Sequence, residues 1–306
     1  MGKSLKLVPW LLALPLAWLI GYSYNVIYGG GISWLRIMYQ NKLELASEID
    51  SQRRVIIIGG SGVHYTINAE QIEQELGIPV FNLGLDGKLG LNVLLPSVLP
   101  AIREGDIVVL IPEYLMLSDS DGLGEISSWF GVATGKPGLG DIPPKQLLQD
   151  TWLLGIPSLR ALTKSGIDLI TKGQLEEYYS DPLTNRGDPT KTWERSSQWW
   201  KLTVNEPISP HSIAMINSFQ QQVEAKGATL LLSLSWIYGS TDPQTVKNIQ
   251  ITAKELEAIA PLLYNRESLN IKTDSSLFAD THYHLKPEGR KLRSQELAQQ
   301  LQPYVR

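Results

Sequence analysis

The sequence predicts an α/β fold in which a parallel sheet carries helices on both faces, and two observations support this prediction. Strand and helix patterns alternate over residues 55–114, and the alternation resumes from residue 211 to the end of the chain. The run at residues 55–58 is continuously β-branched, which is typical of a strand buried on both faces. Alternation of this kind favours a doubly wound parallel sheet.

Each element of the first half has its own local signal. After the strand at residues 55–58, a helix is predicted from Asn68, which suits an N-cap, to Gly77, which suits a C-terminal stop. The next elements are a strand at 78–87 that ends in a glycine-rich loop, a helix at 91–102 that Pro96 and Pro100 disturb, and a strand at 106–114.

The second half continues the pattern after a long interruption. A helix is predicted at 211–227, a strand at 228–236, a helix at 242–260 and a final helix at 286–305, with Pro287 in its first turn. Residues 115–210, approximately, contain extended loops and some helix and are predicted to be an insertion. No internal repeat is found.

The N-terminal segment predicts a membrane anchor. No charged residue occurs between Lys6 and Arg36, and the apolar run from Leu7 just reaches the roughly 20 residues that span a bilayer. Lysines on the short N-terminal side favour a cytoplasmic N-terminus and an extracytoplasmic main domain. A cleaved signal peptide is the alternative, although no convincing small-residue cleavage site follows.

These features define three predicted regions. They are an anchor at residues 1–30, an amphipathic linker helix at 31–52, and an α/β domain at 53–306 that contains the insertion.

Composition excludes several classes of function. The 306 residues include 27 basic and 31 acidic side chains, so the charge balance gives no reason to expect a nucleic-acid partner. The absence of cysteine excludes disulfides and thiolate metal sites, and four histidines argue against a multi-histidine metal site. We therefore expect no metal and no other cofactor.

Three segments fall beyond the carboxyl ends of predicted strands or just before the last helix, where ligands bind in such folds. They contain Ser61 in "GGSG", Asn82 and Gly84 in "NLGLDG", and Asp280 and His284 in "FADTHYHLKPEG". Singly, Ser61 suits a helix cap and Asp280 a turn. Together, a serine, a base and a carboxylate suit nucleophilic catalysis.

The ordered blocks "IIIGGSG", "NLGLDG" and "DTHYHLKPEG" resemble the SGNH (GDSL-like) hydrolase superfamily. The resemblance is greatest to the membrane-anchored branch related to alginate O-acetylation proteins and the teichoic-acid D-alanylation protein. It covers about residues 53–114 and 211–302. It implies a flavodoxin-like three-layer sandwich with Ser61 as nucleophile, His284 as base and Asp280 orienting that base. It also implies an oxyanion hole that includes the backbone N–H groups of Ser61 and Gly84.

The chain departs from the family pattern at three positions. Gly60 stands where the common motif has an aspartate before the serine. Three residues, rather than the usual two, separate Asp280 from His284. The asparagine of the third block is missing after "DIVVLI" (106–111), where Pro112, Glu113 and Tyr114 follow, and Asn82 is the candidate to replace it in the oxyanion hole.

Other residues remain open as alternatives. His282 competes with His284, because residues two apart in an extended segment point the same way. His64 ranks third and is interpreted as a surface or turn residue. The insertion contains Trp129, Trp199 and Trp200, which suit a substrate groove or a small satellite core.

Two functions follow from these observations. The first is a membrane-anchored serine esterase or O-acyltransferase acting on an acylated cell-surface polysaccharide; transfer would also require a membrane acyltransferase as partner. The second is a catalytically inactive protein of the same fold that binds glycan or scaffolds a surface-polymer assembly complex. A phosphate loop formed by "GGSG" is disfavoured, because the glycine spacing does not fit and no lysine follows.

Overall fold

The computed structural model describes residues 8–28, 32–173, 182–192 and 200–305, and the chain divides into two compact units. Unit 1 comprises residues 1–40 and 126–180, and unit 2 comprises residues 41–125 and 181–306.

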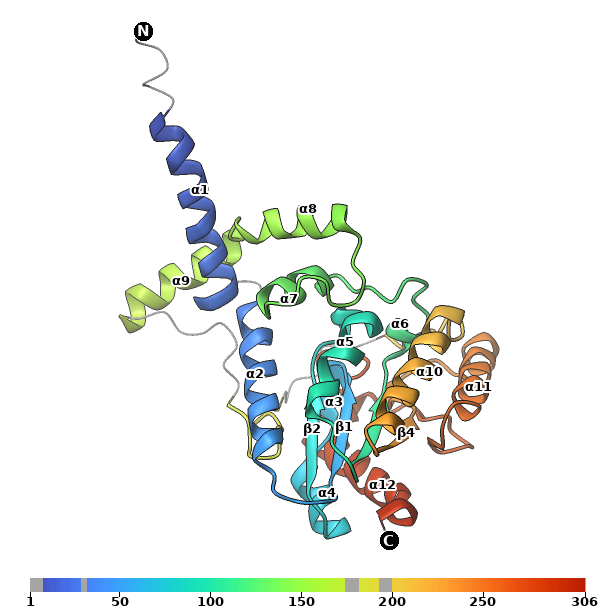
Figure 1. The fold of residues 1–306 in the computed structure, drawn as a ribbon. Coiled ribbons are helices and arrows are strands. Elements are labelled where there is room, and N and C mark those ends of the chain that lie inside the picture. Colours follow the sequence, from blue (N-terminus) through green and yellow to red (C-terminus); the bar gives the residue numbers. More distant parts are fainter. Residues whose placement is uncertain (1–7, 29–31, 174–181, 193–199, 306) are drawn as a thin grey trace. The chain divides into compact units, whose positions relative to one another are not determined.

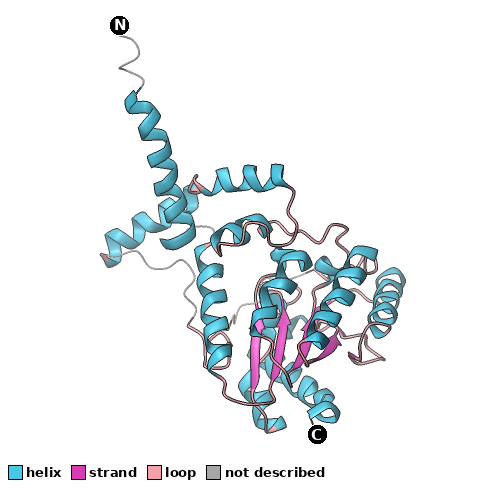
Figure 2. Ribbon diagram, viewed as in Figure 1, coloured by secondary structure: helices cyan, strands magenta, loops and turns pink. Residues whose placement is uncertain are grey.

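Unit 2 contains a five-stranded parallel sheet in the order β2-β1-β3-β4-β6, which is the flavodoxin-like order. Figure 2 shows strands of this unit in magenta among the helices in cyan. Its strands are β1 (Val55–Gly59), β2 (Val80–Gly84), β3 (Ile107–Ile111), β4 (Thr229–Ser233) and β6 (Leu262–Leu263). A separate two-stranded sheet pairs β5 (Ile237–Tyr238) with β7 (Ile271–Lys272). The predicted α/β fold with a parallel sheet is therefore confirmed.

The helices of unit 2 connect these strands (Figure 1). They are α3 (Ser61–Thr66), α4 (Ala69–Leu76), η2 (Gly87–Leu89), α5 (Gly90–Val98), η3 (Leu99–Ala101), α6 (Tyr114–Leu117), α10 (Pro210–Ala225), α11 (Pro243–Glu257), η4 (Ser275–Leu277) and α12 (Pro287–Val305).

A continuous apolar core joins one face of the sheet to α3, α4 and α12. Alternate strand residues point to this face, as the two-residue period of a strand requires. The core includes Val55, Ile57, Val63, Ile72, Ile107, Val109, Leu231, Leu297 and Leu301. On the sheet, α10 packs against β4 and also contacts α5.

Local sequence signals placed several element ends correctly. The Asn68 side chain accepts a hydrogen bond from the Gln71 backbone N–H at 3.1 Å, which caps α4 at its start. Gly77 ends α4 with a positive φ of 72°, a conformation that glycine adopts without steric cost. Pro287 is the first residue of α12, where its missing N–H leaves no helical bond unmade.

A buried ion pair fixes the amino ends of two central strands. Arg54, which precedes β1, donates to both carboxylate oxygens of Asp106, which precedes β3, at 2.8 and 2.9 Å. Both side chains are almost fully buried. Because a buried charge without a partner is costly, each residue depends on the other.

Unit 1 is helical and contains the apolar N-terminal segment. Its helices are α1 (Val8–Ser23), η1 (Tyr24–Tyr28), the first half of α2 (Ser33–Glu48), α7 (Ser127–Ala133), α8 (Pro144–Leu154) and α9 (Leu159–Lys172). The 18-residue stretch Leu11–Tyr28 is apolar and only 17% buried, so it could be a membrane anchor or a signal sequence.

The two units divide the chain differently from the predicted regions. Residues 126–180 of the predicted insertion belong with the N-terminal segment, whereas its two ends belong to the unit that contains the sheet. The α2 helix covers most of the predicted linker, and its second half belongs to unit 2.

Candidate active site

Strand register brings three loops together at one edge of the sheet. Gly59, the last residue of β1, pairs with Gly84 of β2 on one side and with Ile111 of β3 on the other. The chain segments that leave these strands therefore start side by side at the carboxyl edge of the sheet. They contain Ser61, Gly87 and Glu113 respectively.

Ser61 is the first residue of α3, directly after the β1 loop. Gly60 occupies the N-cap position, and no side-chain capping hydrogen bond is made there, so the Ser61 hydroxyl does not serve as a helix cap. Its Oγ instead lies 3.4 Å from Oε1 of Glu113. Ser61 is half-buried, and its hydroxyl is turned toward the site rather than into the helix.

Glu113 is buried immediately beside Ser61. Its Oε1 accepts a hydrogen bond from the Gly62 backbone N–H at 2.6 Å. Glycines line the space around this carboxyl group: a Cβ atom would lie 2.3 Å from Oε2 if placed on Gly87 and 2.6 Å from Oε1 if placed on Gly60. Only residues without a side chain fit at these two positions while Glu113 keeps its place.

The surroundings of Glu113 disfavour its charged form. Burial raises the pKa of the Glu113 carboxyl above its usual value, and the negative charge of Asp86 raises it further. The hydrogen bond from Gly62 and the proximity of His284 act in the opposite direction but are outweighed. The site therefore contains a carboxyl group with an increased tendency to stay protonated.

His284 and Asp280 form the pair that the sequence predicts. Nδ1 of His284 lies 2.8 Å from Oδ1 of Asp280. Burial opposes ionisation of Asp280, but the hydrogen bond from His284, the charge interaction with that ring and a backbone hydrogen bond together outweigh it, so the pKa of Asp280 lies below its usual value. An ionised Asp280 can only accept, which makes Nδ1 of His284 the donor and Nε2 the acceptor of the neutral imidazole tautomer.

The His284 ring lies beside the helix that begins with Ser61. Its centroid is 4.6 Å from that of Tyr65, which lies four residues after Ser61 and hence on the same face of α3. His284 also lies close enough to Glu113 to lower the pKa of that carboxyl group. Within the described part of the chain, no direct hydrogen bond joins Ser61 to His284. Catalytic hydrogen bonds are often long before substrate binds.

Two residues predicted for the oxyanion hole are used within the protein instead. The Gly84 N–H donates to Oδ1 of Asn82 at 2.9 Å. Gly84 also packs so closely on α3 that a Cβ atom placed on it would lie 2.4 Å from the backbone nitrogen of His64. The fully buried Asn82 donates its amide to Asp188 and to the Val63 and His64 carbonyls. The prediction that Gly84 and Asn82 donate to an oxyanion is therefore wrong.

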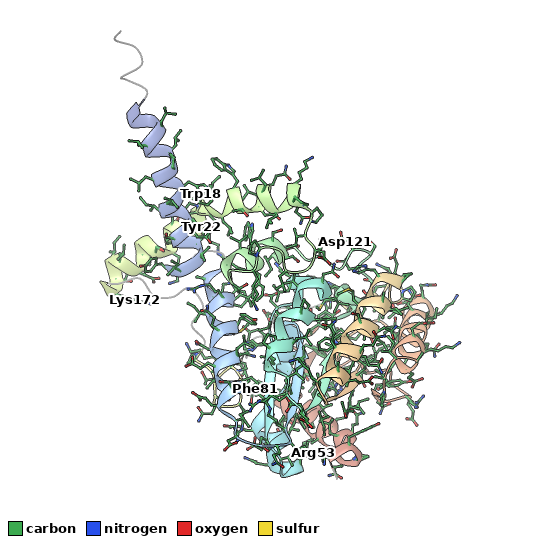
Figure 3. All side chains as sticks on the ribbon, viewed as in Figure 1. Trp18, Tyr22, Arg53, Phe81, Asp121 and Lys172 are labelled. Atoms are coloured by element: carbon green, nitrogen blue, oxygen red, sulfur yellow. The ribbon has the colours of Figure 1, made fainter. Side chains whose placement is uncertain are left out.

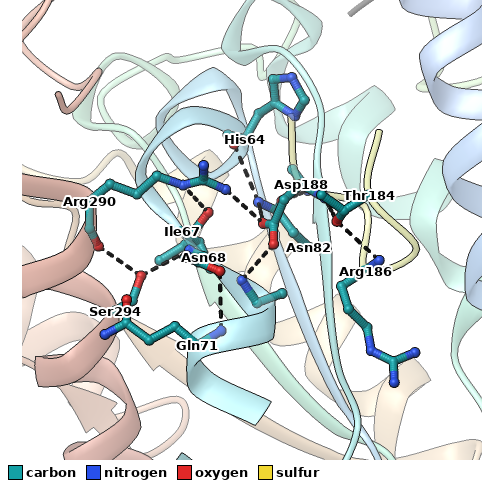
Figure 4. Close-up of polar contacts among 12 residues, drawn as sticks. His64, Ile67, Asn68, Gln71, Asn82, Thr184, Arg186, Asp188, Arg290 and Ser294 are labelled. Carbon is teal, nitrogen blue, oxygen red and sulfur yellow. Dashed lines mark hydrogen bonds and ion pairs between the residues drawn. The ribbon is translucent and has the colours of Figure 1, made fainter. Parts of the chain in front are cut away.

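The Asn82 side chain is part of a buried polar network (Figure 4). The Asp188 carboxylate accepts from Asn82 at 2.9 Å and from the Ala69 N–H at 2.8 Å, and it pairs with Arg290 at 3.2 Å. Arg290 in turn donates to the Ile67 carbonyl at 2.7 Å. The network thus connects β2, α4, α12 and the segment at residues 182–192.

Lys42 extends this network from the second half of α2. Its buried Nζ lies 3.0 Å from Nδ1 of His64 and donates to the carbonyls of Asn82 and Gly84 at 3.0 and 2.7 Å. Burial lowers the pKa of Lys42 to about 7, against the attraction of Asp188.

The two competing histidines occupy different surroundings. His64 is 2% exposed, and burial together with Lys42 holds its pKa well below the usual range, so it is a neutral core residue and not the predicted surface or turn residue. The His282 ring packs edge-on against Trp200 with centroids 5.7 Å apart. Neither shares the hydrogen bond that Asp280 makes with His284.

A pocket of about 440 Å³ adjoins this part of unit 2 in sequence and in space. Its lining residues are Tyr114, Leu115, Ser118, Leu202, Thr203, Val204, Asn205, Glu206, His282 and Tyr283. Tyr114 follows Glu113, and Tyr283 precedes His284; these two tyrosines are joined by a 3.1 Å hydrogen bond from the Tyr114 N–H to the Tyr283 hydroxyl.

The three tryptophans proposed for a substrate groove do not share one place. Trp200 is 51% exposed and stands against His282 at the pocket. Trp129 lies on α7 in unit 1, the other unit of the chain. Trp199 lies outside the described residues.

Glu113 and Lys42 were not predicted as parts of the site. Glu113 lies two residues after the end of β3, as Ser61 lies two residues after the end of β1. The rule that selected Ser61, namely position beyond the end of a parallel strand, would therefore also have selected Glu113. Lys42 gave no comparable signal, because a lysine in an amphipathic helix is usually solvated.

No protein-family model and no curated protein matches the sequence. Among solved structures, the chain is similar to the X-ray crystal structure of the protein YxiM from Bacillus subtilis, at 14% sequence identity and a TM-score of 0.37. The match covers 83% of this chain and 57% of the YxiM chain.

Proposed function

We propose that this chain is an SGNH-like serine enzyme that hydrolyses or transfers acyl groups through Ser61, His284 and Asp280. The observation that carries the proposal is the 2.8 Å hydrogen bond between His284 and Asp280, made by a ring that lies beside the helix beginning with Ser61. This arrangement supplies a nucleophile, a base, and a carboxylate that stabilises the protonated base.

In the acylation step, Nε2 of His284 takes the proton from the Ser61 hydroxyl while Oγ attacks the ester carbonyl carbon. The carbonyl oxygen becomes an oxyanion, which needs hydrogen-bond donors. Backbone N–H groups at the β1 and β2 loops suit this role. Within the described residues, the backbone N–H groups of Ser61 and Gly87 have no acceptor. Ser61 keeps its predicted place in the proposed hole, and Gly87 replaces Gly84 and Asn82.

Glu113 takes part in this proposal in its neutral form. A carboxylate beside Ser61 would repel the oxyanion, whereas a protonated carboxyl group can donate a hydrogen bond to it. Burial, which raises the pKa of Glu113, favours the protonated form. Glu113 would then replace the amide donor that the family places after the third strand.

The second step resolves the acyl-enzyme. Acylation ends when the tetrahedral intermediate collapses, its bond to the alcohol oxygen breaks, and protonated His284 gives its proton to that alcohol. Nε2 then takes a proton from water or from a sugar hydroxyl as its oxygen attacks the acyl carbon. His284 returns this proton to Oγ of Ser61 as the bond between the acyl carbon and Oγ breaks. Water gives hydrolysis and a sugar hydroxyl gives transfer. The polar residues Thr203, Asn205 and Glu206 and the nearby Trp200 ring support a sugar ligand in the pocket, in keeping with an acylated cell-surface polysaccharide as substrate.

The chain is proposed to be anchored with its main domain outside the cytoplasm. Lys3 and Lys6 favour a cytoplasmic N-terminus. A retained anchor is supported over a cleaved signal because the apolar segment packs on later parts of unit 1. The Asn25 side chain, for example, donates to the Leu154 carbonyl at 2.8 Å and is buried there.

A second candidate function is an inactive protein that binds glycan or scaffolds a surface-polymer assembly complex. The observation that favours it is the contact of the Ser61 hydroxyl with Glu113, because an ionised Glu113 would block the position that an oxyanion must occupy.

Labelling with a serine-reactive fluorophosphonate separates the two candidates. The detergent-solubilised full-length protein is expected to acquire one adduct, which peptide mapping places at Ser61. The Ser61→Ala and His284→Ala variants are expected to lose it, while Ser118→Ala, a serine that lines the pocket, keeps it. A folded protein that stays unlabelled would contradict the enzymatic proposal and favour the glycan-binding one.

A further inference from the structure

The exposed apolar surface of this protein is concentrated in unit 1. Of the 21 large apolar residues exposed in the described part of the chain, 17 lie in unit 1 and four in unit 2. Eight of the 17 lie on α1 and η1, as expected of a membrane anchor. The other nine are Leu148, Trp152, Leu153, Ile156, Leu159, Leu162, Ile167, Leu169 and Ile170, on α8, α9 and the turn between them. We call this pair of helices and the turn between them the α8–α9 segment.

The α9 helix is amphipathic, and it exposes its apolar face as well as charged side chains such as Arg160 and Lys172. Leu159 and Ile170 are 81% and 87% exposed, whereas Ala161 and Asp168 are buried. A helix at the surface of a soluble domain buries its apolar stripe and exposes its charges. On α9 the Asp168 carboxylate is instead enclosed by two lysines of its own helix, Lys164 and Lys172. The apolar face therefore requires an apolar environment outside the protein.

Hydrogen bonds join the α8–α9 segment to the C-terminal half of the apolar N-terminal segment. The Trp18 indole nitrogen donates to the Trp152 carbonyl at 2.9 Å, and the Tyr24 hydroxyl donates to the Ala161 carbonyl at 2.7 Å. The Trp18 ring also stacks on Tyr22, and both project from α1 in Figure 3. Within unit 1, Figure 1 shows α8 and α9 near the end of α1 that leads into α2. The α8–α9 segment is thus attached to the span Leu11–Tyr28 itself.

We propose that the α8–α9 segment lies in the interface of the lipid bilayer, with the apolar face that includes Leu148, Leu159 and Ile170 immersed in lipid. This inference rests on the membrane anchor proposed above. The bilayer is the partner of this apolar surface because the surface continues that of the anchor, and hydrogen bonds hold the α8–α9 segment to the end of the anchor.

Helix length decides between lying in the membrane and crossing it. The α8 helix has 11 residues and α9 has 14, which at about 1.5 Å per residue are shorter than the roughly 30 Å hydrocarbon core. Neither helix can span the bilayer. Short helices with an apolar face and lysines on the opposite face instead bind along the membrane surface.

The cysteine-free sequence allows a direct test in the full-length protein. Single cysteines at Leu148, Ile170, Lys172 and Leu14 would be labelled with a fluorophore, and each protein reconstituted into phosphatidylcholine–phosphatidylglycerol vesicles. Half of the samples would contain lipids with a nitroxide quencher on the acyl chain. All four positions are exposed, and Lys172 is the matched control because it lies on α9 opposite Ile170. Circular dichroism would verify that each variant is folded.

The expected result is that labels at Leu148 and Ile170 lose fluorescence to the same extent as the label at Leu14, while the label at Lys172 loses little. Quenching at Leu14 without quenching at Leu148 and Ile170 would overturn the proposal for the α8–α9 segment and leave the proposed anchor intact. Absence of quenching at Leu14 as well would overturn both. Labels that are shielded from water but not quenched, with shielding that depends on the protein-to-lipid ratio, would indicate a second copy on this surface and overturn the proposal.

Discussion

The carboxyl group beside the candidate nucleophile gives the sharpest prediction. Replacing Glu113 by Gln keeps the shape of the side chain and a hydrogen-bond donor but removes the possibility of a negative charge. If neutral Glu113 assists oxyanion formation, the wild-type protein should react more slowly with a fluorophosphonate as the pH rises through the raised pKa of Glu113. The Glu113→Gln variant should lack this decline.

The size of the effect follows from the position of the charge. The Glu113 Oε1 lies 3.4 Å from Ser61 Oγ, the atom to which the new tetrahedral centre is attached. Two unit charges roughly 4 Å apart repel by about 4 kcal/mol at an effective dielectric constant of about 20. Because about 1.4 kcal/mol corresponds to a tenfold change in rate, ionisation of Glu113 is expected to slow acylation by up to about a thousandfold.

The assay is the second-order rate constant of fluorophosphonate labelling at Ser61, measured between pH 5 and pH 9. Any pH dependence that the two proteins share cancels in the ratio of their rates. The ratio of the variant rate to the wild-type rate should increase with pH. The exposed Glu224→Gln variant on α10 is the control and should follow the wild type. A ratio that stays constant, or a variant that is slower at every pH, would refute the reasoning.

Three further predictions concern the residues around the site and the sheet. Asp280→Asn removes the carboxylate that orients His284 and should reduce the labelling rate about 10²–10⁴-fold, whereas His282→Ala should keep most of it; equal losses would contradict the assignment. Asp106→Ala leaves the Arg54 guanidinium buried and unpaired and should destabilise the fold by about 3–5 kcal/mol in urea unfolding; a loss under about 1 kcal/mol, as for an exposed pair, would contradict the burial argument. Because burial lowers the pKa of Lys42 to about 7, the unfolded chain binds more protons than the folded one between that pH and 10.5. Stability should therefore rise with pH in that window, by at most on the order of 5 kcal/mol, and Lys42→Met should flatten the rise.

Features that depend on neighbours in sequence could be predicted, and features that depend on neighbours in space could not. The cap at Asn68, the stop at Gly77 and Pro287 at the start of α12 follow from local chemistry. Asp280 and His284 lie within one stretch of five residues, so their pairing could also be predicted from the sequence.

The errors at the site have a common physical cause. The contact between Ser61 and Glu113 arises because β3 lies next to β1 in the sheet, which strand patterns alone do not specify. The assignment of Gly84 to an oxyanion hole failed because Asn82, two residues earlier, already accepts its N–H. Pairs such as Asn25 and Leu154 are 129 residues apart, so the association of the insertion with the N-terminal segment had no sequence signal.

The buried lysine on α2 determines where this chain can be cut for study in solution. A fragment that starts at Asn41 would retain Lys42 but place it in the first turn of a frayed helix, where its ammonium group would not be held against the β2 carbonyls. Those carbonyls belong to the strand that leads into Gly87, so loosening them would disturb the loop that the proposed chemistry uses. A fragment that begins at Ser33, the start of α2, keeps more than two helical turns before Lys42 and preserves the contacts behind the site.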